Sequence, residues 1–170
     1  MALADHIIRV VKNKPGMRMQ LLTQCGIQPS PEVIADVQKS FGIKGPDAFP
    51  AIVTVARLVA QHTPATGQFE GHNAESKALG RVLRQWADAT GTKDQVLKRI
   101  TRCVSMDLKY SRPHIESMLN QLLGKGYQLN IGSLFGDLMH WDDKPAMPRI
   151  RLVTSFSRLN DDAEATSEDT

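Results

Sequence analysis

Apolar residues recur along this chain at the three- and four-residue spacing of amphipathic helices, in segments bounded by proline, glycine and capping residues. In the first part of the chain this spacing predicts helices over about residues 3–11, 17–26, 31–41 and 47–62. The third helix begins with Ser30 as N-cap, Pro31 at its first position and Glu32 in its first turn. The fourth is rich in β-branched residues, but its length and spacing favour a helix over a strand.

Five more helices are predicted after a stretch of turn formers without periodicity. A capping box from Thr92 to Gln95 opens one of them, Ser111 to Pro113 opens the next, and Asn130 caps another. Their predicted ranges are 79–90, 93–104, 111–124, 131–139 and 147–159. The sequence therefore predicts an all-α protein, a bundle of roughly eight helices in two small lobes.

The expected domain organisation follows from where the periodicity stops. Residues 1–62 form an N-terminal helical lobe, residues 63–75 a mobile loop, and residues 76–159 a C-terminal helical lobe. An acidic disordered tail is expected over 160–170.

Length and composition exclude several classes of protein. A chain of 170 residues can bury roughly 70% of its unfolded surface as one domain or two small lobes. A hydrophobic content of 41% excludes collagen-like and wholly disordered chains. No apolar run reaches the ~20 residues of a membrane span, and the start of the chain has no signal-peptide pattern. Cys25 and Cys103 are expected to be free, buried thiols of a cytoplasmic protein.

The net charge of +3 is unevenly distributed along the chain. Residues 1–158 hold 21 basic and 13 acidic side chains, a net charge of +8, whereas residues 159–170 have a net charge of −5. A basic body of this kind suggests a polyanionic partner.

Three of the predicted helices carry basic stripes with few acidic partners. Surface cations usually form a solvated face, but three neighbouring stripes favour a surface that tracks phosphates. No aromatic residue is interleaved with them, so backbone contacts are expected rather than base readout. The candidate nucleic-acid-binding residues are Lys77, Arg81, Arg84, Lys98, Arg99, Arg102, Arg149 and Arg151.

The sequence gives no support for catalysis, a metal or a cofactor. It has no glycine-rich phosphate loop or dinucleotide fingerprint, and its five histidines lack metal-ligand spacing. Asp142 and Asp143 look like a metal-binding pair, but a turn or helix cap before Pro145 explains them as well. A protein without enzymatic activity is therefore expected.

Four stretches, in this order, resemble a known family. They are Lys14-Pro-Gly16 before Met19-Gln-Leu21; Phe41-Gly42-Ile43 before Pro46 and Ala60-Gln-His62; Leu79-Gly80-Arg81-Val82-Leu83; and Gln128 to Leu134 with Asp137-Leu138, Trp141 and Arg149-Ile-Arg151 to Phe156. Over about residues 3–159 the chain resembles the small subunit (CasB family) of the type I-E CRISPR surveillance complex, Cascade.

This resemblance implies an all-helical subunit without catalytic activity, present in two copies. Such subunits lie beside the guide RNA backbone, contact the target strand, help to hold the displaced DNA strand, and associate with the large subunit and the backbone subunits. Arg81 is the strongest candidate within the matched motifs. Family members often carry an arginine pair where this chain has Leu22 and Thr23, and Lys44 or Arg57 are possible substitutes.

Two other hypotheses remain open from the sequence. One is a helical adaptor whose basic face binds an acidic protein. The other is a small hydrolase or nuclease that uses a divalent metal at Asp142 and Asp143.

Overall fold

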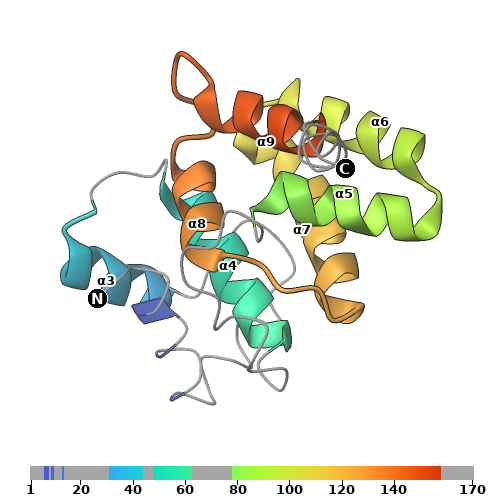
Figure 1. Cartoon of the computed structure of the whole chain (residues 1–170). Helices are drawn as coiled ribbons and strands as arrows, with labels where there is room; N and C mark the ends of the chain where they lie inside the picture. The colour runs from blue at the N-terminus through green and yellow to red at the C-terminus, as the bar shows by residue number, and fades with distance from the viewer. Residues whose placement is uncertain are drawn as a thin grey trace, which may run out of the picture.

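The chain folds into packed α-helices, with no strand among the residues that the structure describes (Figure 1). This computed structural model describes residues 6, 7, 9, 13, 31–43, 48–62 and 78–157. The helices with defined bounds are α3 (Pro31–Phe41), α4 (Phe49–His62), α5 (Leu79–Thr90), α6 (Lys93–Val104), α7 (Leu108–Gly124), α8 (Ile131–Met139) and α9 (Met147–Ser157). The predicted all-α fold class is confirmed. The predicted helix over 17–26, the loop over 63–75 and the tail over 160–170 lie outside the described residues.

Helix α4 is the most deeply buried element of the N-terminal part. Nine of its fourteen residues are buried, and it packs against α7 and α8, with α3 on its other side. Because it is surrounded by other helices, it can be apolar around most of its circumference. The β-branched residues Ile52, Val53 and Val55 are therefore core residues of a helix, as the spacing predicted.

The C-terminal part is organised around the packing of α5 on α9. Helix α6 packs on α5, α7 and α9, and α7 links this group to α4. Buried residues from α3 and α4 and from α5 to α9 belong to one core cluster. The division into two lobes stays a prediction, since the stretch that would join them is outside the described residues.

The helix ends show which of the predicted start signals are used. Asn130 caps α8, because its side chain accepts a hydrogen bond from the backbone N–H of Ser133 at 3.0 Å. The capping box at Thr92 is not formed; the Thr92 hydroxyl instead lies 2.6 Å from the hydroxyl of Thr90.

The predicted start of α7 at residue 111 is wrong. The helix begins three residues earlier, at Leu108, and Pro113 lies inside it. The backbone carbonyl of Asp107 accepts from the N–H of Ser111 at 2.9 Å. The N–H of Leu108 donates to the carboxylate of Asp142, at 3.0 and 3.2 Å from its two oxygens. A cap supplied from a distant loop therefore starts this helix, which no local pattern could indicate.

None of the described helices is both long enough and apolar enough to cross a membrane.

Candidate nucleic-acid interface and the neighbouring groove

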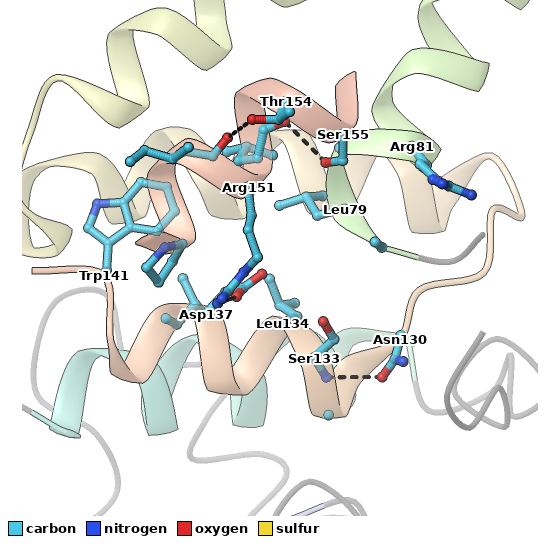
Figure 2. Close-up of a pocket in the computed structure, with 17 residues that line it drawn as sticks. Leu79, Arg81, Asn130, Ser133, Leu134, Asp137, Trp141, Arg151, Thr154 and Ser155 are labelled. Atoms are coloured by element: carbon cyan, nitrogen blue, oxygen red, sulfur yellow. Dashed lines mark hydrogen bonds and ion pairs between the residues drawn. The ribbon is translucent and has the colours of Figure 1, made fainter. Parts of the chain in front are cut away.

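One groove of about 870 Å³ is lined by two consecutive helices and by a third segment that is far from them in the sequence (Figure 2). They are the start of α5, the helix α8 with its flanking residues, and α9. Trp141 and Arg81 lie at opposite ends of this groove in Figure 2. The Leu79–Leu83 element and the motif that extends from Gln128 to Phe156 thus meet in space. The residues on which the family resemblance depends most are packed around a single feature of the fold.

Gly80 sets how closely α5 approaches α9 beside this groove. A Cβ atom on Gly80 would lie 1.9 Å from the Ser155 hydroxyl, 2.6 Å from the Leu152 carbonyl oxygen and 2.9 Å from the Phe156 nitrogen. Two of these three atoms belong to the backbone of α9, so they cannot rotate away. Glycine is required here because of the close backbone approach.

Arg81 follows this glycine and lines the groove, and it is partly exposed. It remains a candidate for phosphate contact. Lys77, the first member of the same predicted stripe, lies outside the described residues, as does Lys44.

Arg84 has a different position from the one expected for a member of an exposed stripe. The residue is only 6% exposed. Its Nε donates to both carboxylate oxygens of Asp88, at 2.8 and 2.9 Å, and its Nη1 donates to the backbone carbonyl of Phe156 at 3.3 Å. Its guanidinium carbon also lies 5.8 Å from the centre of the Phe156 ring. The expected exposure of Arg84 was wrong, because the pattern did not show that α9 covers this part of α5.

Arg149 is likewise occupied inside the fold. Its Nε donates to the Trp141 carbonyl at 2.8 Å and its Nη1 to the Val104 carbonyl at 3.3 Å. Its Nη2 lies 2.6 Å from a carboxylate oxygen of Asp142 and 3.2 Å from one of Asp107. This guanidinium therefore joins the end of α6, the start of α7 and the loop before α9, and only 17% of its side chain is exposed.

The same contacts explain the Asp142-Asp143 pair. Asp142 accepts from Leu108 and Arg149, and Asp143 lies 2.7 Å from the imidazole Nδ1 of His140. Among the described residues, no group of three or more His, Cys, Asp or Glu side chains could hold a metal ion. Both aspartates therefore have structural partners, Asp142 at the starts of α7 and α9 and Asp143 at the end of α8.

Arg151 extends from α9 across the groove to Asp137 on α8 (Figure 2). Its Nη2 lies 2.5 Å from a carboxylate oxygen of Asp137, while 57% of the arginine side chain stays exposed. Because more than half of the arginine side chain is exposed and one terminal nitrogen bonds Asp137, other donors of Arg151 stay accessible at the rim of the groove.

Helix α6 carries three of the predicted cations, Lys98, Arg99 and Arg102, which we call the α6 cationic face. The side chains of Lys98 and Arg102 are exposed and form no ion pair or hydrogen bond with any residue that the structure describes. Arg99 donates to two neutral groups on α7, the Gln121 amide oxygen at 2.8 Å and the Ser117 hydroxyl at 3.3 Å. None of the three positive charges therefore forms an ion pair with a described carboxylate, which suits a phosphate-binding surface.

The interior side of this helix has an inert thiol. Cys103 is fully buried, and burial raises its pKa from 9.0 to about 11, against the opposing effect of Arg99 and Arg102. The prediction of a free, buried thiol is confirmed for Cys103, while Cys25 lies outside the described residues.

The sequence interpretation missed a polar cluster between α4 and α7. Glu116 accepts from the Thr54 hydroxyl at 3.2 Å and lies 3.6 Å from Arg112 and 3.9 Å from Arg57. Arg57, one of the possible substitutes for the missing arginine pair, is therefore tied to a carboxylate with 19% of its side chain exposed. The spacing of Arg112 and Glu116, four residues apart, was a signal for part of this cluster.

Tyr110 is a second residue that the sequence interpretation missed. It is 62% exposed at the start of α7, and the amino group of Lys109 lies 5.6 Å from the centre of its ring. An exposed aromatic ring beside a cation is thus present on the surface, although it is not part of the α6 cationic face.

Comparisons with known proteins agree with this description at the level of the fold. No protein-family model matches the chain, and no curated protein does. The crystal structure of M. ruber CasB superposes on it with a TM-score of 0.74 and 15% sequence identity, over 98% of this chain and 99% of that one. The chain therefore has the fold of M. ruber CasB over nearly its whole length.

Proposed function

We propose that this chain is the non-catalytic small subunit of a type I-E CRISPR RNA-guided effector, Cascade. The observation that carries the proposal is the near full-length structural likeness to M. ruber CasB. It is supported by the sequence motifs that resemble that family, because two of them meet around one groove. The sequence identity between this chain and M. ruber CasB is 15%.

In this role the subunit binds the backbones of the target and displaced DNA strands beside the guide RNA. Base pairing reads the sequence in such effectors, and protein contacts to the backbone shift a nearly balanced strand exchange. The α6 cationic face offers three charges for such contacts without a base-reading motif, and Arg81 adds a fourth. The partners are the guide RNA, both DNA strands and the other effector subunits, with two copies of this chain in a cytoplasmic complex that serves antiviral defence.

The decisive experiment is assembly. The full chain is co-expressed with the other effector subunits and a guide RNA, and purified through a tag on the large subunit. Co-purification at about two copies supports the proposal. If the other subunits and the guide RNA form a complex that lacks this chain, the proposal is contradicted.

A second experiment tests the α6 cationic face on the isolated protein. Binding of single-stranded DNA should weaken with salt at a slope of about −0.7 per phosphate contact in a plot of log K against log salt concentration. The double variant Lys98→Ala, Arg102→Ala should make this slope shallower by about 1.4. Lys39→Ala, an exposed cation on α3, is the matched control and should leave the slope unchanged. Equal slopes for all three proteins would remove the α6 cationic face from the interface, and no binding at low salt would favour a protein adaptor.

A further inference from the structure

The groove between α5, α8 and α9 differs in character from the α6 cationic face. Much of its lining is apolar, with Leu79, Leu134, Leu138, Trp141 and Leu152 among the residues. Its charged lining residues are Arg81, Arg151 and Asp137, which give a net charge of +1. A phosphate backbone lying inside the groove would meet the Asp137 carboxylate and its partner Arg151, because Arg81 lies at one end of the groove (Figure 2). The inner lining therefore does not suit a nucleic acid, whereas Arg81 can contact phosphate from the end of the groove.

The rim of the groove exposes apolar surface on α9. Ile150 lines the groove and is 54% exposed, and Met147, one turn earlier, is 47% exposed. These are two of the four large hydrophobic residues that are exposed in the described part of the chain. Exposed apolar side chains at a groove, next to polar groups, are typical of a protein-binding site.

Arg151 adds a specific polar contact at the same rim. One of its terminal nitrogens is bonded to Asp137, and more than half of the side chain is open to solvent. A guanidinium has five N–H donors and binds carboxylates in a two-point geometry. A carboxylate on an incoming segment can therefore share this arginine with Asp137, next to the apolar surface of Ile150.

The walls of the groove are already fixed in the free protein. The close contact at Gly80 holds the start of α5 against α9, and the side-chain cap at Asn130 orders the start of α8. A site whose walls do not need to be ordered on binding loses less free energy to conformational entropy.

We propose that this groove binds a short segment of another protein subunit of the effector. The segment places an apolar side chain against Ile150 and Leu134 and a carboxylate on Arg151. The identity of the partner rests on the proposed function, whereas the chemistry of the segment follows from the groove itself.

Site-specific photo-crosslinking in the assembled, nucleic-acid-loaded effector tests this inference. In the test protein, p-benzoylphenylalanine replaces Ile150. In the control protein it replaces Tyr110, which is exposed at the start of α7 and does not line the groove. The expected result is a crosslink from position 150 to another protein subunit, which is absent from position 110. A crosslink from position 150 to RNA or DNA would overturn the inference.

A charge variant at the same position gives the second readout. Ile150→Glu changes an exposed residue, and it places a carboxylate where the partner's carboxylate must approach. We expect co-purification with the other subunits to fall roughly tenfold, as for a residue that anchors an interface, while single-stranded DNA binding stays at the wild-type level. Normal assembly of Ile150→Glu would overturn the groove inference alone. Failure of the wild-type chain to assemble would overturn the proposed function, and this partner with it.

Discussion

Gly80 on α5 and Leu152 on α9 are so close that a Cβ atom on the glycine would lie 2.6 Å from the leucine carbonyl oxygen. Real Cβ atoms do not come this close to a carbonyl oxygen, so the contact excludes every other residue at this position unless the two helices move apart. It also lies beside the groove that Leu79, Gly80 and Arg81 of the Leu79–Leu83 element help to line. The glycine of that element is thus explained by packing, and the arginine after it lines the groove.

Replacing Gly80 with alanine should destabilise the protein. An alanine gains helix propensity, by up to about 1 kcal/mol, but overpacking against a backbone typically costs about 1–3 kcal/mol. We expect a net loss of free energy of unfolding, measured by urea denaturation. Gly136→Ala is the matched control, because Gly136 is also helical and its added Cβ would have no atom within 4 Å; it should stabilise α8 by about 1 kcal/mol. Equal stability of the Gly80→Ala variant and the wild type would refute the packing argument.

Arg84 should matter for stability and not for nucleic-acid binding. Arg84→Met keeps the aliphatic part of the side chain but removes the hydrogen bonds to Asp88 and to the Phe156 carbonyl. Loss of bonds to a charged, buried group costs about 1.5–3 kcal/mol. Asp88→Asn, on the half-exposed side of the pair, should cost less than 1 kcal/mol. The salt dependence of single-stranded DNA binding should match the wild type in both variants, and a shallower slope for Arg84→Met alone would show that Arg84 reaches phosphate.

Helices that carry their own start and end signals could be predicted from the sequence. The Asn130 cap is a local feature and is found where expected. Helix α5 ends at the predicted residue 90, where Gly91 follows with a left-handed backbone conformation at φ 66°. The start of α7 could not be predicted, since its cap comes from Asp142, 34 residues further along the chain. The same limit applies to the basic stripes. Helical spacing placed Arg81 and Arg84 together, but only the packing of α9 decides that one is partly exposed and the other buried.

The contacts of Arg149 lead to a further prediction about stability. Its guanidinium bonds two backbone carbonyls and the carboxylates of Asp107 and Asp142 at once. Lysine keeps the charge but has neither the planar shape nor enough donors for this arrangement. Arg149→Lys should therefore lower the free energy of unfolding by about 2 kcal/mol, nearly as much as Arg149→Ala, in urea denaturation.

A double-mutant cycle separates the Arg149–Asp142 pair from the other contacts of the arginine. Asp142→Ala also removes the cap on Leu108, but this loss occurs in the single and the double variant alike and cancels in the cycle. Non-additivity therefore reports the contact between Arg149 and Asp142. We expect a coupling free energy of 0.5–3 kcal/mol, the usual range for residues in direct contact. Strict additivity, or wild-type stability of Arg149→Lys, would show that the arginine does not hold these segments together.

Cys103 should make the protein less stable at alkaline pH. Its pKa is about 11 in the folded protein and 9.0 when unperturbed, so the unfolded state releases the thiol proton first. The contribution of the thiol is fully present below pH 9 and is lost as the pH rises from 9 towards 11. Two pKa units correspond to roughly 3 kcal/mol at most.

The measurement compares two proteins in a Cys25→Ala background, one with Cys103 and one with Cys103→Val. Lysine and tyrosine residues titrate in the same range in both proteins, so only the difference between them reports the thiol. The free energy of unfolding of the Cys103 protein should fall more steeply between pH 9 and 10.5. At pH 8, a thiol reagent should react with Cys103 only at the rate at which the fold opens, because the sulfur is fully buried and the reagent cannot reach it in the folded protein. Parallel pH profiles, or labelling as fast as that of the unfolded chain, would mean that Cys103 is not sealed within the core beneath the α6 cationic face.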